Sequence, residues 1–158
     1  MNIFYKTHKI MIQIVQITAL ETFLVRHPVL RNGKPIESCH FDGDDLASTK
    51  HFGLFDNGVL AGVISVFEQS FVAFANEKQF QIRGMAVLEH FRKRGFGERL
   101  VLEVEQYVRT QNGELIWFNA RENAVNFYSN LGYQIIGDAF EIKDIGLHYR
   151  MFKNLNEI

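Results

Sequence analysis

The chain has 158 residues, of which 47% are hydrophobic, and its formal net charge at pH 7 is −1. This length and apolar content predict one folded domain spanning residues 1–158 and exclude an intrinsically disordered chain, while the balanced charge gives no general affinity for nucleic acid. Cys39 is the single cysteine, which excludes an internal disulfide framework and fits a cytoplasmic protein, and the six histidines show no metal-ligand spacing.

The N-terminal apolar run, residues 10–20, is predicted to be neither a signal peptide nor a membrane span. Two glutamines interrupt it, no small-residue cleavage site follows it, and it is too short to cross a bilayer. Its alternation of side chains predicts a strand instead. We therefore expect no membrane partner and a tail over residues 1–9, and a translation start at Met1 or at Met11 stays open.

A helix is predicted directly after that strand. Thr18 and Glu21 form a capping box, and apolar residues recur at helical spacing until Pro28, which should kink or end the helix. The polar stretch that follows, residues 31–49, is expected to be a loop and contains four acids: Glu37, Asp42, Asp44 and Asp45. Cys39 lies in this loop and could be a nucleophile, although no local motif marks it as one.

A hairpin follows the loop. The Asp-Asn-Gly sequence at residues 56–58 separates two apolar runs and predicts two antiparallel strands within residues 51–67. Residues 68–78 are ambiguous between a longer strand and a turn. Residues 79–88 then predict a core strand, in which Gly84 indicates a bulge or a close backbone approach.

The turn after this strand is the most informative part of the sequence. It precedes an amphipathic helix that stops at residues 112–113. The turn contains three cations and two glycines: Arg92, Lys93, Arg94, Gly95 and Gly97. Cations at a helix N-terminus cost roughly 0.3–1 kcal/mol each, and glycines let several backbone N–H groups converge on one point. Both features favour a bound phosphate. A solvated basic turn, in which the glycines only ease a tight bend, is the alternative.

Residues 115–118 form a continuous apolar run, typical of a strand buried on both faces, and predict a strand over residues 114–120. The basic turn thus belongs to a crossover between two strands that we expect to be parallel, and ligands of such sheets bind at the carboxyl ends of the strands. Closing strands are expected at residues 133–136 and 147–152. Before them, a short helix stopped by Gly132 should bury Ala124, Phe127, Tyr128 and Leu131.

Two motifs, at residues 92–97 and 123–133, together resemble those of the GCN5-related N-acetyltransferase (GNAT) superfamily. Arg-x-x-Gly-x-Gly at residues 92–97, after a Met-Ala-Val strand end, is similar to the acetyl-coenzyme A signature of that family. The second motif, residues 123–133, contains Phe127-Tyr128 before a Gly-Tyr pair. The resemblance is strongest over residues 79–137. It implies a mixed α+β fold in which a central, mostly antiparallel sheet contains a splayed parallel pair of strands and is flanked by helices.

The resemblance also implies acetyl-coenzyme A as co-substrate. The basic turn would hold the pyrophosphate, the strand backbone before it would pair with the pantetheine arm, and an N–H at the bulge would polarise the thioester carbonyl. Tyr128 matches the position of the general acid, with a core aromatic as the alternative, and Asn123 could both cap its helix and reach the arm. The implied cofactor-binding residues are Met85, Ala86, Val87, Arg92, Lys93, Arg94, Gly95, Phe96, Gly97, Asn123 and Tyr128.

The general base is not marked by the sequence. Many members of the family carry a glutamate on the strand before the turn, where this chain has Gln81 and Arg83. His148 is favoured because its ordinary pKa lies near neutrality. A water chain could serve instead, and Arg83 and Arg121 could bind a carboxylate of the acceptor or make surface ion pairs. The other candidate bases are Glu141, Glu68, Glu77 and His90.

By the resemblance, the loop at residues 31–49 covers the acceptor site, and its acidity would suit a cationic amine or would simply be solvated. We predict direct acetyl transfer to a primary amine of a small molecule through a ternary complex, without a metal. A non-catalytic acyl-coenzyme A sensor and a turn that binds another phosphorylated ligand, such as a nucleotide, are the alternatives. The acceptor and the oligomeric state, with a homodimer as one option, stay open.

Overall fold

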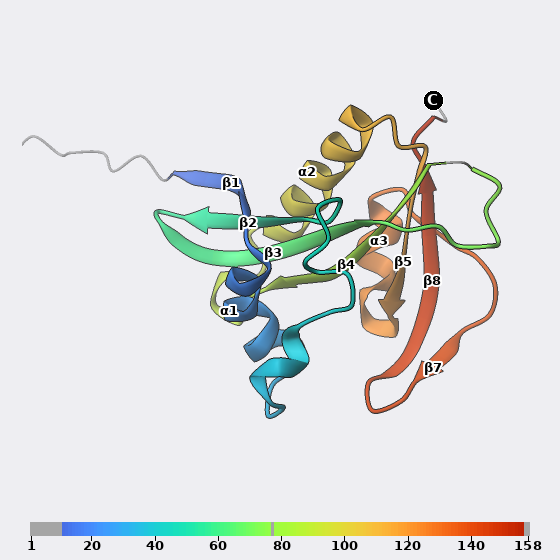
Figure 1. Ribbon diagram of the computed structural model, residues 1–158. Helices are drawn as coiled ribbons and strands as arrows, with labels where there is room; N and C mark the ends of the chain where they lie inside the picture. Colours follow the sequence, from blue (N-terminus) through green and yellow to red (C-terminus); the bar gives the residue numbers. More distant parts are fainter. Residues whose placement is uncertain (1–10, 77, 157–158) are drawn as a thin grey trace, which may run out of the picture.

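A central sheet runs through the protein in the computed structural model, which describes residues 11–76 and 78–156 (Figure 1). Its eight strands within these residues lie in the order β1-β2-β3-β4-β5-β8-β6, with β7 beside β8. They are β1 (Ile12–Ile17), β2 (Lys50–Asp56), β3 (Val59–Glu68), β4 (Gln79–Val87), β5 (Leu115–Arg121), β6 (Gln134–Ile135), β7 (Phe140–Ile142) and β8 (Gly146–Asn154). β4 and β5 are parallel, and every other described pair is antiparallel. The predicted mixed sheet is confirmed.

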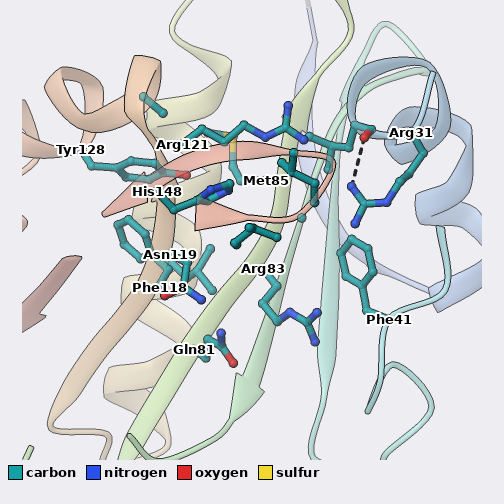
Figure 2. Close-up of a pocket in the computed structure, with 16 residues that line it drawn as sticks. Arg31, Phe41, Gln81, Arg83, Met85, Phe118, Asn119, Arg121, Tyr128 and His148 are labelled. Carbon is teal, nitrogen blue, oxygen red and sulfur yellow. Dashed lines mark hydrogen bonds between the residues drawn. The ribbon is translucent and has the colours of Figure 1, made fainter. Parts of the chain in front are cut away.

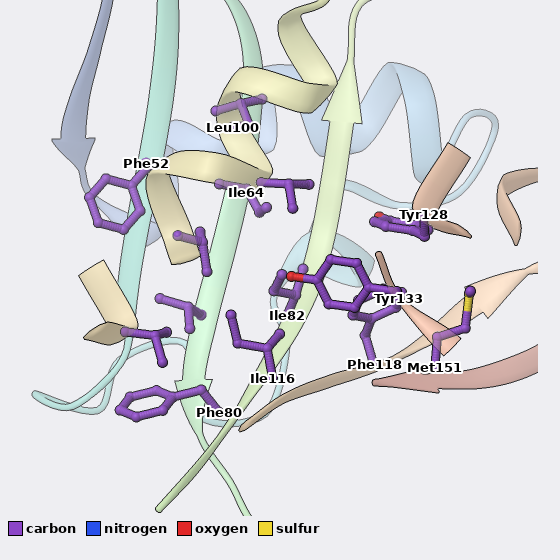
Figure 3. Close-up of a cluster of buried hydrophobic side chains, with 14 of the residues drawn as sticks. Phe52, Ile64, Phe80, Ile82, Leu100, Ile116, Phe118, Tyr128, Tyr133 and Met151 are labelled. Atoms are coloured by element: carbon purple, nitrogen blue, oxygen red, sulfur yellow. The ribbon is translucent and has the colours of Figure 1, made fainter. Parts of the chain in front are cut away.

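Helices cover both faces of the sheet. α1 (Ala19–Leu30) packs on one face, where Val25 joins a cluster with Ile17 and Val63. The residues that α2 (Phe96–Thr110) and α3 (Val125–Asn130) bury belong to the larger core cluster on the other face (Figure 3). The apolar residues of α2 recur at helical spacing, and four of them are fully buried: Leu100, Val101, Val104 and Val108.

β4 separates from β5 part-way along its length and carries a bulge where it pairs with β3. It pairs with β5 only at residues 79–81, although both strands continue, so the two strands diverge (Figure 1). On the opposite edge, Gly84 and Met85 together face one residue of β3 and form a β-bulge. Gly84 has φ +64°, and a Cβ there would lie 2.9 Å from Cε2 of Phe41, so this position requires glycine. The predicted bulge and the splayed strands are confirmed.

The helix α1 starts as predicted and does not end at Pro28, which was one of the two expected effects of this residue. The Oγ of Thr18 accepts a hydrogen bond from the backbone N–H of Glu21 at 3.2 Å, which confirms the cap. The helix then continues through Pro28 to its last residue, Leu30. Proline lacks the N–H that would bind the carbonyl of Leu24. Leu24 lies on the exposed face of the helix.

The remaining differences from the prediction are local. β6 is shorter than the strand expected at residues 133–136, because Tyr133 turns into the core, and β7 was not predicted. Residues 69–76 form a loop and not a strand extension. The predicted tail at residues 1–9 and the candidate base Glu77 lie outside the described residues. Within the described part of the chain, no helix is long and apolar enough to cross a membrane.

Candidate active site

A basic turn with two left-handed residues joins β4 to α2. Lys93 has φ +61° and Gly95 has φ +76°, and Gly95 precedes the first residue of α2 without a side-chain cap. Such a conformation directs backbone N–H groups towards one point, and the start of a helix adds partial positive charge, so the turn suits an anion. Gly97 allows α2 to approach α3, because a Cβ there would lie 3.2 Å from Cζ of Phe127.

A cavity of about 440 Å³, here called the turn cavity, runs along this turn. Its walls are mainly apolar and include Val29, Phe91 and Phe127, while Arg92 and Lys93 bring positive charge to it. This combination suits a long ligand that has both apolar segments and phosphates. Eight of the predicted cofactor-binding residues line the turn cavity: Met85, Ala86, Val87, Arg92, Lys93, Gly95, Phe96 and Gly97.

A second cavity of about 320 Å³, here called the splay cavity, lies where β4 and β5 diverge (Figure 2). Side chains from β4, β5, β8 and α3 line it, and its apolar wall includes Phe118. Met85 lines both cavities. Phe127 and Tyr128 follow one another in α3, but Phe127 lines the turn cavity and Tyr128 lines the splay cavity. The two cavities therefore lie on either side of Met85, a residue of the bulge. A ligand held along the turn could present its end to a second molecule in the splay cavity.

Tyr128 projects from α3 towards the splay cavity (Figure 2). The residue is only 6% exposed, and its ring packs against Phe118 with centroids 4.2 Å apart. Its hydroxyl makes no hydrogen bond to any described residue. Burial raises the pKa of Tyr128, so the hydroxyl keeps its proton at neutral pH. The side chain is both a core aromatic and an available proton donor.

His148 of β8 also lines the splay cavity and is 4% exposed (Figure 2). Its Nδ1 lies 2.7 Å from the carbonyl oxygen of Gly146. Because a carbonyl can only accept, Nδ1 carries the ring proton and Nε2 of the neutral ring keeps its lone pair. Asn119 of β5 lines the same cavity, and its Oδ1 is buried without a hydrogen-bond partner. The cavity thus contains a proton acceptor and a free amide oxygen.

The acidic loop, residues 31–49, does not bring negative charge into the splay cavity, which corrects the expectation of an acidic site. Its residue Asp44 is buried and accepts hydrogen bonds from Nη1 and Nη2 of Arg26 at 2.6 and 3.1 Å. Although burial opposes it, this bond to Arg26 lowers the pKa of Asp44. Arg26 also donates to Oγ of Ser65, which in turn contacts Nδ1 of His51. This buried network fastens the loop against the sheet.

Comparison with known proteins gives the family. A model of the acetyltransferase (GNAT) family matches residues 16–133. The chain belongs to the GNAT family. It is 31% identical over 145 residues, 92% of this chain and 97% of the relative, to a Bacillus subtilis (strain 168) protein named Uncharacterized N-acetyltransferase YitI. The predicted family and the acyltransferase class are confirmed.

Solved structures confirm the GNAT fold. An aminoglycoside 6′-N-acetyltransferase complexed with coenzyme A superposes with a TM-score of 0.73 at 16% identity, over 92% of this chain and 98% of the other. Arabidopsis thaliana NAA60 in complex with acetyl-CoA superposes with a TM-score of 0.72 at 15% identity, over 93% of this chain and 100% of the other.

Three of the cofactor-binding residues that the GNAT resemblance implies do not line the turn cavity. Tyr128 lines the splay cavity instead. Arg94 donates from Nη1 to Oδ2 of Asp56 at 2.6 Å and does not line the turn cavity. Asn123 is exposed in a 3₁₀ turn, η3 (Glu122–Ala124), and the predicted cap is wrong, because α3 has no side-chain cap. The backbone of η3 provides the partner instead, since the N–H of Val125 donates to the carbonyl of Glu122.

Among the candidate bases of this GNAT chain, the structure brings His148 alone into the splay cavity, as far as the described residues show. Glu141 on β7, Glu68 at the end of β3, and His90 are exposed and do not line it. Cys39 is fully buried, and burial raises the pKa of its thiol, two features of a structural cysteine and not of a nucleophile. The described residues hold no cluster of three or more potential metal ligands.

The residues of the splay cavity that sequence reasoning missed include Arg31, Phe41 and Asn119. Arg31 follows the last residue of α1, and Phe41 lies in the acidic loop, so neither belongs to a motif. Asn119 offered one signal, because it is a polar residue at the end of the apolar run that forms β5.

Proposed function

We propose that this chain is an acetyl-coenzyme A dependent N-acetyltransferase that transfers acetyl directly to a primary amine of a small molecule in a ternary complex. The observation that carries the proposal is that Met85 lines both the turn cavity and the splay cavity, and that the splay cavity is also lined by Tyr128 and His148. The splay cavity, at about 320 Å³, has the size of a small-molecule site.

The residues of the turn cavity fit coenzyme A. Arg92, Lys93 and the N–H groups of the turn would hold the pyrophosphate, and the backbone of residues 85–87 would pair with the pantetheine arm. Acetyl-coenzyme A supplies an activated thioester, whose carbonyl a backbone N–H of the bulge would polarise. The structural support is the open edge of β4 beyond its last pairing with β5 and the mixed apolar and cationic lining.

His148 and Tyr128 would divide the two proton transfers. Nε2 of His148 accepts the proton that the amine loses as its nitrogen bonds to the acetyl carbon. The carbon–sulfur bond breaks, and the Tyr128 hydroxyl donates its proton to the departing sulfur. Because burial raises the pKa of Tyr128, the donor is fully protonated at the start of the reaction. Oδ1 of Asn119 is free to accept a remaining N–H of the amine.

A thermal-shift titration with acetyl-coenzyme A, coenzyme A and ATP tests the ligand. A ligand that binds only the native state stabilises it by RT ln(1 + [L]/Kd), which is about 2.7 kcal/mol at one hundred times Kd. We expect a saturable shift with both coenzyme A species and none with ATP. A shift with ATP alone would favour another phosphorylated ligand, and no shift with either coenzyme A species would contradict the proposal.

The Tyr128→Phe variant separates the enzyme from a non-catalytic sensor. We expect it to lower kcat by roughly 10²–10⁴-fold, measured by thiol release, and to leave the Kd of acetyl-coenzyme A unchanged, because only a proton donor is lost. Tyr149→Phe, on the same strand as His148 but outside both cavities, is the matched control. A chain that binds acetyl-coenzyme A and releases no thiol with any amine would support the sensor.

A further inference from the structure

Three arginines surround the splay cavity. Arg31 follows α1, Arg83 precedes the bulge of β4, and Arg121 ends β5 (Figure 2). None of them pairs with a carboxylate within residues 11–76 and 78–156, where the ion pairs to acids are those of Arg26, His40, Arg94 and Lys153. The lining of the cavity contains no acidic side chain. The lining of the splay cavity therefore carries three cationic side chains and no acid. Burial lowers the pKa of Arg83, and the nearby charges of Asp44 and Asp42 act against that shift.

Packing holds two of these guanidinium groups in place. Arg31 and Arg83 lie over the ring of Phe41, with their Cζ atoms 5.2 and 4.8 Å from its centroid. Their hydrogen bonds go to backbone carbonyls, at 3.0 to 3.3 Å, and use few of the five donors that each guanidinium carries. Burial and then the charge of Arg121 lower the pKa of Arg31. The arginines are thus held close enough to repel one another, which an anion would relieve.

The third arginine lies beside the candidate base. Arg121 and His148 face each other across β5 and β8, so their side chains leave the same face of the sheet with Cβ atoms about 4.5–5.5 Å apart. Asn119, two residues before Arg121 on the same strand, contributes the unpartnered Oδ1. The positions for an amine and for an anion are therefore adjacent, and a compact molecule could occupy both.

We propose that the acceptor is an amine that also carries an anionic group, a carboxylate or a phosphate, which Arg31, Arg83 and Arg121 bind. The inference rests on the proposed acetyl transfer and names its substrate class. Guanidinium groups bind both anions through paired, charge-assisted hydrogen bonds. Ile142 and Ile145 add an apolar wall that leaves room for a hydrocarbon side chain. Small amino acids and short aminoalkyl phosphates carry both an amine and an anionic group.

Calorimetry on the protein saturated with coenzyme A tests the class without relying on turnover. The probes are two matched pairs: L-methionine with L-methioninamide, and phosphoethanolamine with ethanolamine. We expect the anionic member of at least one pair to bind at least about 10-fold more tightly, and the pair that shows the preference identifies the anion. Arg83→Gln and Arg121→Gln should each weaken the anionic probe by about 10- to 100-fold and leave its neutral partner nearly unchanged.

Arg99→Gln is the control, because Arg99 is exposed on α2 and lines neither cavity. Arg121→Lys should recover part of the affinity, since lysine keeps the charge but loses the planar fork. Equal binding within both pairs, tighter binding of the neutral members, or no binding of any probe would overturn the inference if coenzyme A still binds. If the wild-type chain does not bind coenzyme A, that result would instead overturn the proposed function itself.

Discussion

Replacing Gly84 by alanine tests whether the bulge of β4 requires glycine. The residue has φ +64°, where a side chain costs roughly 1–2 kcal/mol. The added methyl group would lie 2.9 Å from Cε2 of Phe41 and 3.0 Å from Nε of Arg26, and both side chains are buried. Overpacking of a buried site costs typically about 1–3 kcal/mol. We expect the free energy of unfolding, measured in urea, to fall by about 2–5 kcal/mol.

Gly137→Ala separates the backbone contribution from the packing contribution. Gly137 has a similar φ of +76°, but a Cβ there would meet no atom within 4 Å, so only about 1–2 kcal/mol should be lost. A loss at Gly84 no greater than the loss at Gly137 would refute the packing argument. Because Met85 follows Gly84 and lines both cavities, Gly84→Ala should also weaken the binding of acetyl-coenzyme A, whereas Gly137→Ala should not.

Two further predictions concern the buried network under the acidic loop. Asp44→Ala leaves the fully buried Arg26 without its carboxylate and should lower the free energy of unfolding, measured in urea, by about 3–5 kcal/mol. The control Asp42→Ala removes an exposed carboxylate and should cost less than about 0.5 kcal/mol. Equal losses for the two variants would contradict the ion pair. Burial lowers the pKa of His51, so below the ordinary pKa of about 6.5 the unfolded chain binds the extra proton and stability should fall as pH drops from 7 to 5. His51→Gln should flatten that slope in urea unfolding at each pH, and an unchanged slope would show that another group titrates.

Structural features that depend only on residues close together in the sequence could be predicted from the sequence. Asn57 and Gly58 both adopt positive φ, as their hairpin turn requires, and the glycines of the basic turn allow the conformation from which α2 starts. The same holds for Gly84, whose place inside an apolar strand predicted the bulge. Each of these signals lies within a few residues of the structure that it specifies, so the local backbone leaves few alternatives.

The chemistry of the splay cavity could not be read in this way. Arg94 looked like a phosphate ligand of the turn, but it pairs with Asp56, a residue 38 positions earlier. Arg83 and Arg121 had two open roles, and only the divergence of β4 and β5 placed them around one cavity. The side chain of an arginine is long, and its partner depends on which distant element packs beside it.

By itself, the sequence determined the family, the order of the elements apart from β7, and the turn that suits a phosphate, because periodicity, caps and glycine conformations act over short stretches of chain. Only the tertiary structure decided the charge of the splay cavity. Asp44 looked available to a cationic substrate, but it is buried against Arg26, 18 residues away, while Arg31, Arg83 and Arg121 converge without a carboxylate partner among the described residues. Burial and pairing of a charge depend on contacts between distant segments, which local sequence patterns do not encode.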